Sequence, residues 1–104
     1  MILARWSIDA RFGQEIEVLK AMMKWKKEIG SSIGWTDMQL LSGSIGTKES
    51  TMHLEVCLPD FAALEAAWNK LGTIEAHQRW SKELEPFIVS GSNRWEAFRI
   101  IPNN

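Results

Sequence analysis

Hydrophobic and polar residues alternate over residues 2–9 (ILARWSID) at the start of the chain. A period of two built from β-compatible residues predicts a strand. Between Gly13 and Gly30 the apolar spacing becomes helical and charged residues lie opposite, which predicts an amphipathic helix packed on a flat surface. Gly30 is expected to end this helix. Its broad apolar arc comprises Ile16, Val18, Leu19, Met22, Met23, Trp25 and Ile29.

The middle of the chain has the pattern of a β-hairpin. Residues 35–41 form a second extended stretch, and the segment SGSIGTKES (42–50) is rich in the glycine and serine that favour loops. Residues 51–58 (TMHLEVCL) then alternate cleanly between apolar and polar positions. Two strands joined by a loop are therefore expected.

Helical spacing returns after Pro59, which ends the strand. Asp60 is a suitable N-cap for a helix that Gly72 closes, and Thr73 can cap a further helix. Because this junction can also be a kink in one helix, the number of helices stays open at two or three. Residues 94–101 (RWEAFRII) predict a last strand. The apolar stripes are Phe61, Leu64, Trp68 and Leu71, then Ile74, His77, Trp80, Leu84 and Phe87 or Ile88.

The order of elements, β-α-β-β-α(α)-β, is that of the split βαβ or ferredoxin-like arrangement. We therefore predict one α+β domain over residues 1–104, with a four-stranded antiparallel sheet whose first and third strands are central. Helices are expected on one sheet face only. An exposed apolar patch on the other face usually marks an interface, so a homodimer with sheets packed face to face is expected. The residues of that patch would be Leu3, Leu41, Cys57 and Trp95.

Composition removes several classes of function. Twelve Lys and Arg against thirteen Asp and Glu leave a net charge of -1, which lacks the basic footprint of a nucleic-acid-binding protein. No apolar run approaches the roughly 20 residues of a membrane span, and no secretory signal is visible. The single Cys57 permits neither an internal disulfide nor a cysteine-based zinc cluster. We expect a cytoplasmic protein with no nucleic-acid or membrane partner.

By its order of elements essentially the whole chain resembles a known superfamily, and the resemblance is most specific at residues 60–80. The segment DFAALEAAWNKLGTIEAHQRW (60–80) joins a helix, a short break and an E-A-H start to the next helix, and the chain closes on RWEAFRII. Together with the order of elements, these segments resemble the dimeric α+β barrel superfamily, which includes the NIPSNAP proteins and the antibiotic-biosynthesis monooxygenases. The resemblance implies a dimeric barrel. It leaves the activity open, because members include cofactor-independent oxygenases, haem-degrading and haem-binding enzymes, muconolactone-isomerase-like proteins and proteins of unknown function.

Polar side chains on the sheet face without helices form a first candidate site. Neighbouring strands lie about 4.8 Å apart, so Arg5 can reach His53 or Glu55 across the central strand pair. A carboxylate beside His53 would raise the pKa of its imidazole. The set is either a polar pocket inside the barrel or a network of ion pairs at the dimer interface. Its expected members are Arg5, Ser7, Asp37, Gln39, His53, Glu55 and Arg99.

A second candidate site lies between the helices and the sheet, at Trp68 and His77. The haem-degrading branch of the superfamily uses an axial His on this helix, a Trp on the preceding helix and an Asn on the first strand. Trp68 and His77 match the first two by resemblance, whereas Ser7 stands where the Asn is expected. The alternative is that His77 bonds a nearby carbonyl at the edge of the core. Apart from haem in that branch, no metal or cofactor is expected.

The six tryptophans are spread one to an element along the chain, and tyrosine is absent. This spread predicts that the indoles fill the core and the interface, since a ligand cage would concentrate them. Only Trp68 keeps an expected chemical role, through His77.

The sequence therefore predicts a homodimeric α+β barrel protein of unassigned activity. A small molecule is expected to bind in a cavity of the barrel or between the helices and the sheet. One alternative is a monooxygenase, either cofactor-independent on an aromatic substrate or haem-degrading through His77. The other is a dimerisation module without enzymatic activity.

Overall fold

The computed structural model describes residues 1–102, and its elements follow the predicted order. Three α-helices are present, so the junction at Gly72 and Thr73 is a break and not a kink. The strands are β1 (Ile2–Asp9), β2 (Gln39–Ser42), β3 (Thr51–Leu58) and β4 (Arg94–Arg99). The helices are α1 (Glu15–Trp25), α2 (Phe61–Leu71) and α3 (Glu75–Leu84), with short helical turns η1 (Lys26–Gly30), η2 (Ser31–Ile33) and η3 (Glu85–Phe87).

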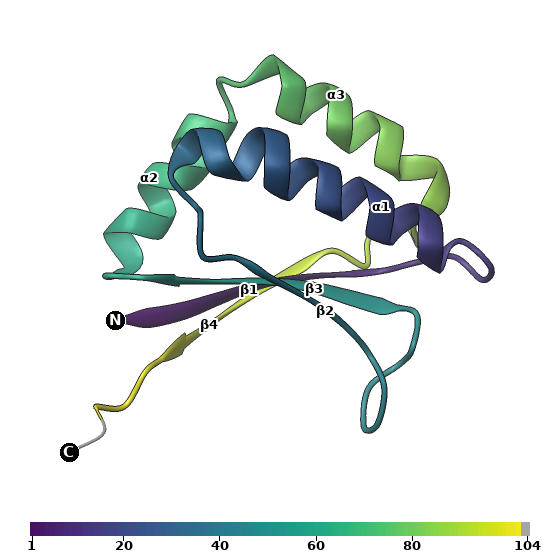
Figure 1. Cartoon of the computed structure of the whole chain (residues 1–104), viewed down its shortest axis with the longest axis horizontal. Helices are drawn as coiled ribbons and strands as arrows, with labels where there is room; N and C mark the ends of the chain where they lie inside the picture. Colours follow the sequence, from purple (N-terminus) through teal and green to yellow (C-terminus); the bar gives the residue numbers. More distant parts are fainter. Residues whose placement is uncertain (103–104) are drawn as a thin grey trace.

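A four-stranded antiparallel sheet forms one layer of the molecule, in the order β2-β3-β1-β4 (Figure 1). The central pair is β1 and β3, as predicted. Ala4 of β1 lies opposite Val56 of β3 on one side and opposite Ala97 of β4 on the other. This topology confirms the predicted ferredoxin-like α+β fold.

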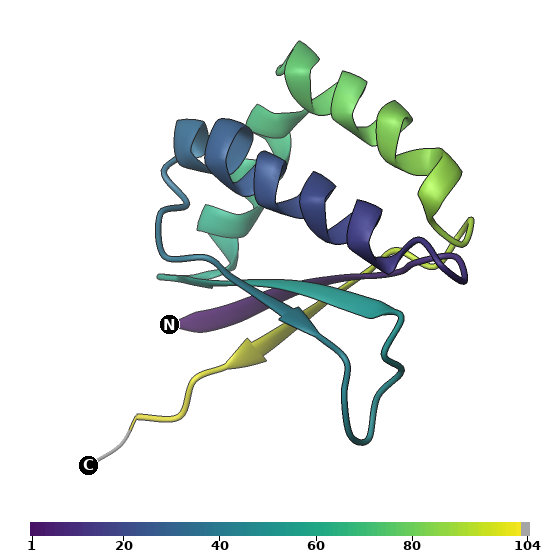
Figure 2. The same ribbon diagram turned by 45° about the vertical axis from the view of Figure 1, so that its right-hand side comes forward.

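All three helices lie over the same face of the sheet (Figures 1 and 2). The alternation predicted for β1 and β3 is confirmed, because the side chains that point toward the helices are buried almost completely. Removing these apolar surfaces from water is the main force that holds the two layers together. The buried set on the strands is Ile2, Ala4, Ile8, Met52, Leu54, Val56 and Leu58.

The apolar arc of α1 is narrower than predicted. Val18, Met22 and Trp25 are buried, whereas Ile16 and Met23 are more than half exposed. The helix therefore contacts the sheet and α3 through a single stripe.

Gly30 does not end the first helix as predicted. The chain continues through the π-helical turn η1 and the 3-10 turn η2, and Gly34 ends it with a φ of 84°, in the left-handed region that favours glycine. Gly30 instead allows close packing, since a β-carbon there would overlap the side chain of Met38 and crowd Trp25.

The second strand is shorter than predicted. Residues 35–38 are not part of β2, but Trp35 and Met38 are buried beneath the helices. Pairing with β3 begins only at Gln39, which lies opposite Glu55. The segment that looked extended in sequence thus crosses from the helical layer to the sheet.

One of the two predicted helix caps is confirmed. The Asp60 carboxylate accepts a hydrogen bond of 2.9 Å from the backbone N–H of Ala63, which satisfies a free donor at the start of α2. Thr73 does not cap α3. Its hydroxyl donates to the carbonyl of Lys70 at 2.7 Å, which ties it to the end of α2.

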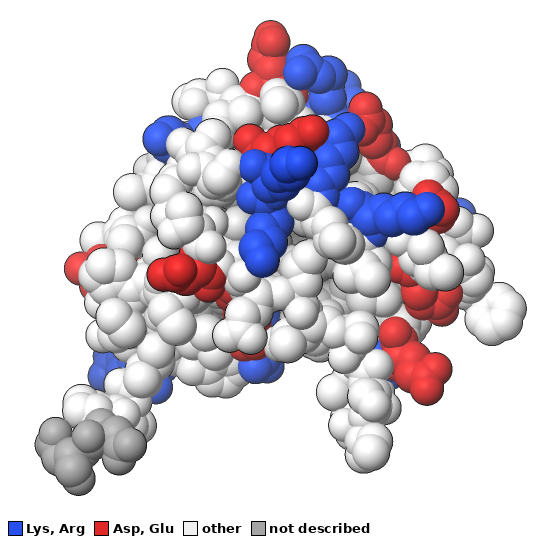
Figure 3. Space-filling view, in the orientation of Figure 1, with Lys and Arg blue, Asp and Glu red and all other residues white. Residues whose placement is uncertain are grey.

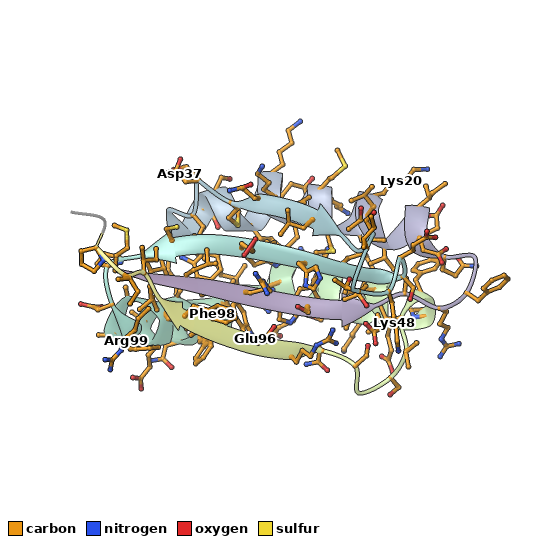
Figure 4. The ribbon with its side chains drawn as sticks, turned by 90° about the horizontal axis from the view of Figure 1, so that it is seen from below. Lys20, Asp37, Lys48, Glu96, Phe98 and Arg99 are labelled. Atoms are coloured by element: carbon orange, nitrogen blue, oxygen red, sulfur yellow. The ribbon has the colours of Figure 1, made fainter. Side chains whose placement is uncertain are left out.

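The face of the sheet opposite the helices, called here the helix-free face, is viewed in Figure 4. β4, with Glu96 and Phe98, forms one edge, and Asp37 lies beyond the β2 edge (Figure 4). Phe98 lies opposite Leu3 and is 43% exposed, and Leu41 is 37% exposed. The prediction that Trp95 lies on this face is wrong, because Trp95 lies opposite Trp6 and faces the helices.

Charges of both signs are mixed over the helices in Figure 3. Lys24 of α1 lies 3.9 Å from Glu83 of α3, and Lys20 lies 3.9 Å from Glu17 one turn away.

Among the described residues, no helix is long and apolar enough to cross a bilayer.

The tight packing around Gly30 generates a first prediction. Gly30→Ala should be less stable than Gly72→Ala by about 1 kcal/mol, because the added methyl must displace the buried end of Met38 and crowds Trp25. Urea unfolding followed by circular dichroism measures the change.

Gly72→Ala is the matched control for this prediction. Gly72 has a helical φ of -62°, and a β-carbon there meets only carbonyl oxygens at ordinary contact distance. Equal midpoints for the two variants would show that close approach at Gly30 is unimportant.

Candidate functional site

A cavity of about 360 Å³ lies between the helical layer and the sheet. Every α-helix contributes to its wall, as do β1, β3 and β4 and the segment before β2. Its volume is in the range of small-molecule binding sites. The lining consists of Trp6, Met22, Trp25, Trp35, Leu54, Trp68, Leu71, Gly72, His77, Trp80, Ser81, Asn93 and Trp95.

All six tryptophans of the chain line this cavity. Their rings form a continuous series from Trp6 to Trp68, with neighbouring centroids 5.4–6.4 Å apart and tilted or edge-to-face geometry. The prediction that the indoles fill the core is confirmed for Trp25, Trp35 and Trp80, but the expectation that they are not concentrated in one place is wrong. β1, β4 and the three α-helices each supply one ring, the segment before β2 supplies Trp35, and the fold gathers the rings in one place.

The indoles divide into a buried floor and an open rim. Trp25 and Trp35 are each 5% exposed, whereas Trp68 and Trp95 are 42% and 36% exposed. The two rim rings contact each other edge to face, with centroids 5.4 Å apart. These two rings are thus the part of the series that solvent reaches most easily.

His77 lies between the indoles of Trp25 and Trp80. The indole N–H of Trp25 donates to its Nδ1 at 2.9 Å, and its ring stacks on Trp80 at an interplanar angle of 16°. Burial lowers the pKa of His77 below the ordinary histidine value, because the charged imidazolium is poorly solvated there. The imidazole is therefore neutral at pH 7. Since Nδ1 accepts a hydrogen bond, the single ring proton lies on Nε2.

This tautomer does not fit an axial haem ligand. A histidine that ligates iron through Nε2 needs a free lone pair there and normally donates from the other nitrogen to a carboxylate or carbonyl. At His77 the donor and acceptor positions are reversed. Ser7, expected in place of an Asn, also points to the helix-free face, away from the cavity. The residues present therefore disagree with the haem alternative.

A second constellation occupies the helix-free face. Arg5 Nη2 lies 3.1 Å from Glu55 Oε2, and Arg5 Nη1 lies 4.0 Å from Glu96 Oε1. Ser7, which is fully buried, shares a hydrogen bond of 2.6 Å with Nδ1 of His53. The predicted polar set thus contains two pairs in contact, Arg5 with Glu55 and His53 with Ser7.

The pKa of His53 shifts opposite to the expected direction. It lies below the ordinary value because of burial first and the positive charges of Arg5 and Arg94 second, which outweigh the carboxylates of Glu55 and Glu96. His53 is thus a neutral partner of Ser7 at pH 7.

The predicted site residues fall into separate groups. Trp68 and His77 lie together in the cavity, whereas the central polar residues lie on the helix-free face, where Gln39 is opposite Glu55. Arg99 is not part of either group, since its partner in the register is Ile2 and it lies at the β4 edge. Asp37 is exposed and precedes β2. Within the described residues, no group of three or more His, Cys, Asp and Glu could hold a metal ion.

Most of the cavity was not predicted as a site. The inward positions of Trp6, Trp25 and Trp80 were recognised as core, but not as the wall of a cavity. Ser81 and Asn93, which supply its other polar groups, carried no signal in the sequence.

The neutral state of His77 generates a prediction about pH. The pKa of His77 is lower in the folded chain than in the unfolded chain, so the unfolded chain binds more protons. The free energy of unfolding is therefore highest above about pH 6.5 and falls as the pH drops through the folded pKa. His53 acts in the same direction. His77→Phe should therefore reduce the loss of unfolding free energy between pH 7.5 and 5.5, measured by urea unfolding. An unchanged slope would contradict the assignment, and the exposed Arg79→Ala serves as control.

No family model matches the chain, and no curated protein matches it by sequence. Among solved structures, a NIPSNAP family protein from Agrobacterium tumefaciens superposes with a TM-score of 0.78 at 17% identity, covering 99% of this chain and 93% of that one. An antibiotic biosynthesis monooxygenase gives 0.70 at 12% identity, over 98% of this chain and 100% of that one.

SnoaB, a cofactor-independent oxygenase from Streptomyces nogalater, gives a TM-score of 0.68 at 11% identity, over 98% of this chain and 94% of that one. Identities this low show a common fold and not a common activity. The chain thus has the fold of the NIPSNAP and antibiotic biosynthesis monooxygenase structures, which confirms the resemblance seen in its sequence.

Proposed function

We propose that this protein binds a small aromatic molecule in the cavity lined by its tryptophans. The observation that carries the proposal is the continuous series of six indoles around about 360 Å³ of open space. Indole faces and edges attract other aromatic rings by burial of apolar surface and by quadrupole geometry. A core that served only for stability would fill this volume with side chains.

The comparisons support a ligand site without selecting an activity. A solved protein described as a cofactor-independent oxygenase shares the fold, and so do NIPSNAP proteins, whose descriptions state no reaction. Among the side chains of the described cavity wall, no nucleophile is aligned with a base. Binding is therefore the function that the geometry supports best.

A fluorescence titration tests the proposal. 2-Acetylnaphthalene should quench the indole emission of the wild-type protein with a Kd on the order of 10–100 µM, as expected for a ligand of this size. Trp68→Ala should weaken binding about three- to tenfold, because a stacking partner at the rim is lost.

Phe12→Ala is the matched control, since Phe12 is fully exposed and lies outside the cavity wall. Its affinity should equal that of the wild type. Failure of the probe to bind the wild type would refute the proposal.

We further propose that a second copy of the chain covers the helix-free face. Leu3, Leu41 and Phe98 place apolar surface there, while the charge of Arg5 is matched by Glu55 and Glu96. Apolar surface with charges already paired can be buried without leaving an uncompensated ion. Two sheets packed in this way would complete the barrel that the fold family resemblance implies.

Sedimentation tests the dimer. The wild type should sediment at twice the chain mass of 11.9 kDa, and Leu41→Glu should shift it toward the monomer because an unpaired charge would enter the interface. Phe12→Glu, on the exposed β1–α1 turn, should leave the dimer intact. A monomeric wild type would contradict the proposal.

A cytoplasmic location is part of the same proposal. Cys57, the single cysteine, lies exposed on β3 as a free thiol, which suits a reducing compartment. Cell fractionation checks this location.

A further inference from the structure

We infer that the cavity selects an uncharged aromatic ligand that carries a hydrogen-bond acceptor, and that His77 recognises the acceptor through its Nε2–H. The inference rests on the proposed function, because it names the chemistry of the molecule bound there. It assigns His77 a role in specificity.

The first step is the fixed tautomer of His77. The N–H of Trp25 can only donate, so Nδ1 of His77 must accept, and Nε2 must carry the proton. Within the described chain, Nε2 has no hydrogen-bond partner, and no buried side-chain nitrogen or oxygen lacks one. Nε2 is therefore accessible, and because His77 is partly buried and lines the cavity, we place its Nε2–H at the cavity wall.

The second step is the rigidity of this donor. Trp25 meets the imidazole edge to face at 6.1 Å between centroids, and Trp80 stacks on it at 6.2 Å. Trp80 is itself anchored, because its indole N–H donates to the carbonyl of Ala21 at 2.7 Å. A donor held in this way loses little conformational entropy when it binds an acceptor.

The third step is the absence of charge in the wall. The lining residues of the described cavity include no Lys, Arg, Asp or Glu, and His77 is neutral. A charged ligand group placed against the floor would lose its hydration without gaining an opposite charge. An ionised carboxylate or ammonium is therefore excluded from the deep end, whereas a carbonyl or ether is not.

The fourth step is the set of ring N–H donors that the buried part of the wall leaves unpaired. Indole nitrogens donate and cannot accept, and Trp35, which is 5% exposed, has no acceptor for its N–H within the described residues. The hydroxyl of Ser81 already donates to the carbonyl of His77 at 3.0 Å, so only its acceptor capacity remains. The N–H groups of His77 and Trp35 therefore complement an acceptor on the ligand, whereas Ser81 and the amide of Asn93 can also meet a ligand donor.

The same geometry argues against His77 as a general base. Its Nε2 already carries a proton, and a proton on Nδ1 would break the hydrogen bond from Trp25. His77 thus orients a neutral ligand and does not remove a proton from it.

Four naphthalene probes of similar shape test the inference by calorimetry. 2-Acetylnaphthalene has a neutral acceptor, 2-isopropenylnaphthalene has none, 2-naphthoate is an anion and 2-naphthylmethylammonium is a cation. The acetyl probe should bind about tenfold more tightly than the isopropenyl probe, because only it satisfies the Nε2–H. Each charged probe should bind at least about 100-fold more weakly than the acetyl probe.

Two variants separate the role of His77 from that of the cavity shape. His77→Phe keeps a ring of similar size and should bring the acetyl and isopropenyl probes to the same affinity, so the ratio of the two affinities is the readout. Trp25→Phe removes the donor to Nδ1 and should reduce the preference, because His77 can then place its proton on either nitrogen. Lys82→Phe, an exposed position on α3 outside the cavity wall, should preserve the preference.

The outcomes distinguish the inference from the proposed function. Binding of the acetyl and isopropenyl probes with equal affinity overturns the inference and leaves the proposed function standing. A preference that survives His77→Phe overturns the role of His77. If neither neutral probe binds the wild type, the proposed function fails and the inference fails with it.

A spectroscopic measurement tests the tautomer independently of any ligand. Nitrogen-15 chemical shifts of the ring of His77 at pH 7.5 should show an unprotonated Nδ1 and a protonated Nε2. The opposite assignment would overturn the inference. Trp25→Phe should move both shifts toward an average of the two tautomers.

Discussion

The alternation of side chains along the central strand β1 determines what lies on each face of the sheet. Because β1 is hydrogen-bonded to both β3 and β4, its side chains are confined to the two faces in turn. Trp6 therefore enters the cavity, while its neighbours Arg5 and Ser7 meet Glu55 and His53 on the helix-free face. A slip of one residue in register would exchange these sets. The cavity and the proposed interface thus depend on one pairing.

The N–H groups of the indoles give the space between the layers its polar character. Every buried indole introduces an N–H group that must find an acceptor or reach open space. Trp80 uses a backbone carbonyl and Trp25 uses His77. The wall offers few other acceptors, because its remaining side chains are mainly apolar.

Local patterns predicted most of the fold, since a strand period, a helical stripe or the cap at Asp60 reports on a few neighbouring residues. The errors involve contacts between distant segments. Gly30 looked like a helix end, but its lack of a side chain serves packing against Met38. Trp68 and His77 were paired by the family resemblance and do line one cavity, whereas Trp95 was predicted on the wrong face. Its strand mixes apolar and charged residues on both faces, so only pairing with Trp6 settles its direction.

The close spacing of the indoles has an optical consequence. Rings whose centroids lie 5.4–6.4 Å apart are near enough for an absorbed excitation to pass from one to the next before emission. The intrinsic fluorescence of this protein therefore belongs to the whole series, from the buried Trp25 and Trp35 to the exposed Trp68. Excitation of any one tryptophan can therefore report a change at any other, so the emission of the whole protein is sensitive to what happens in the cavity.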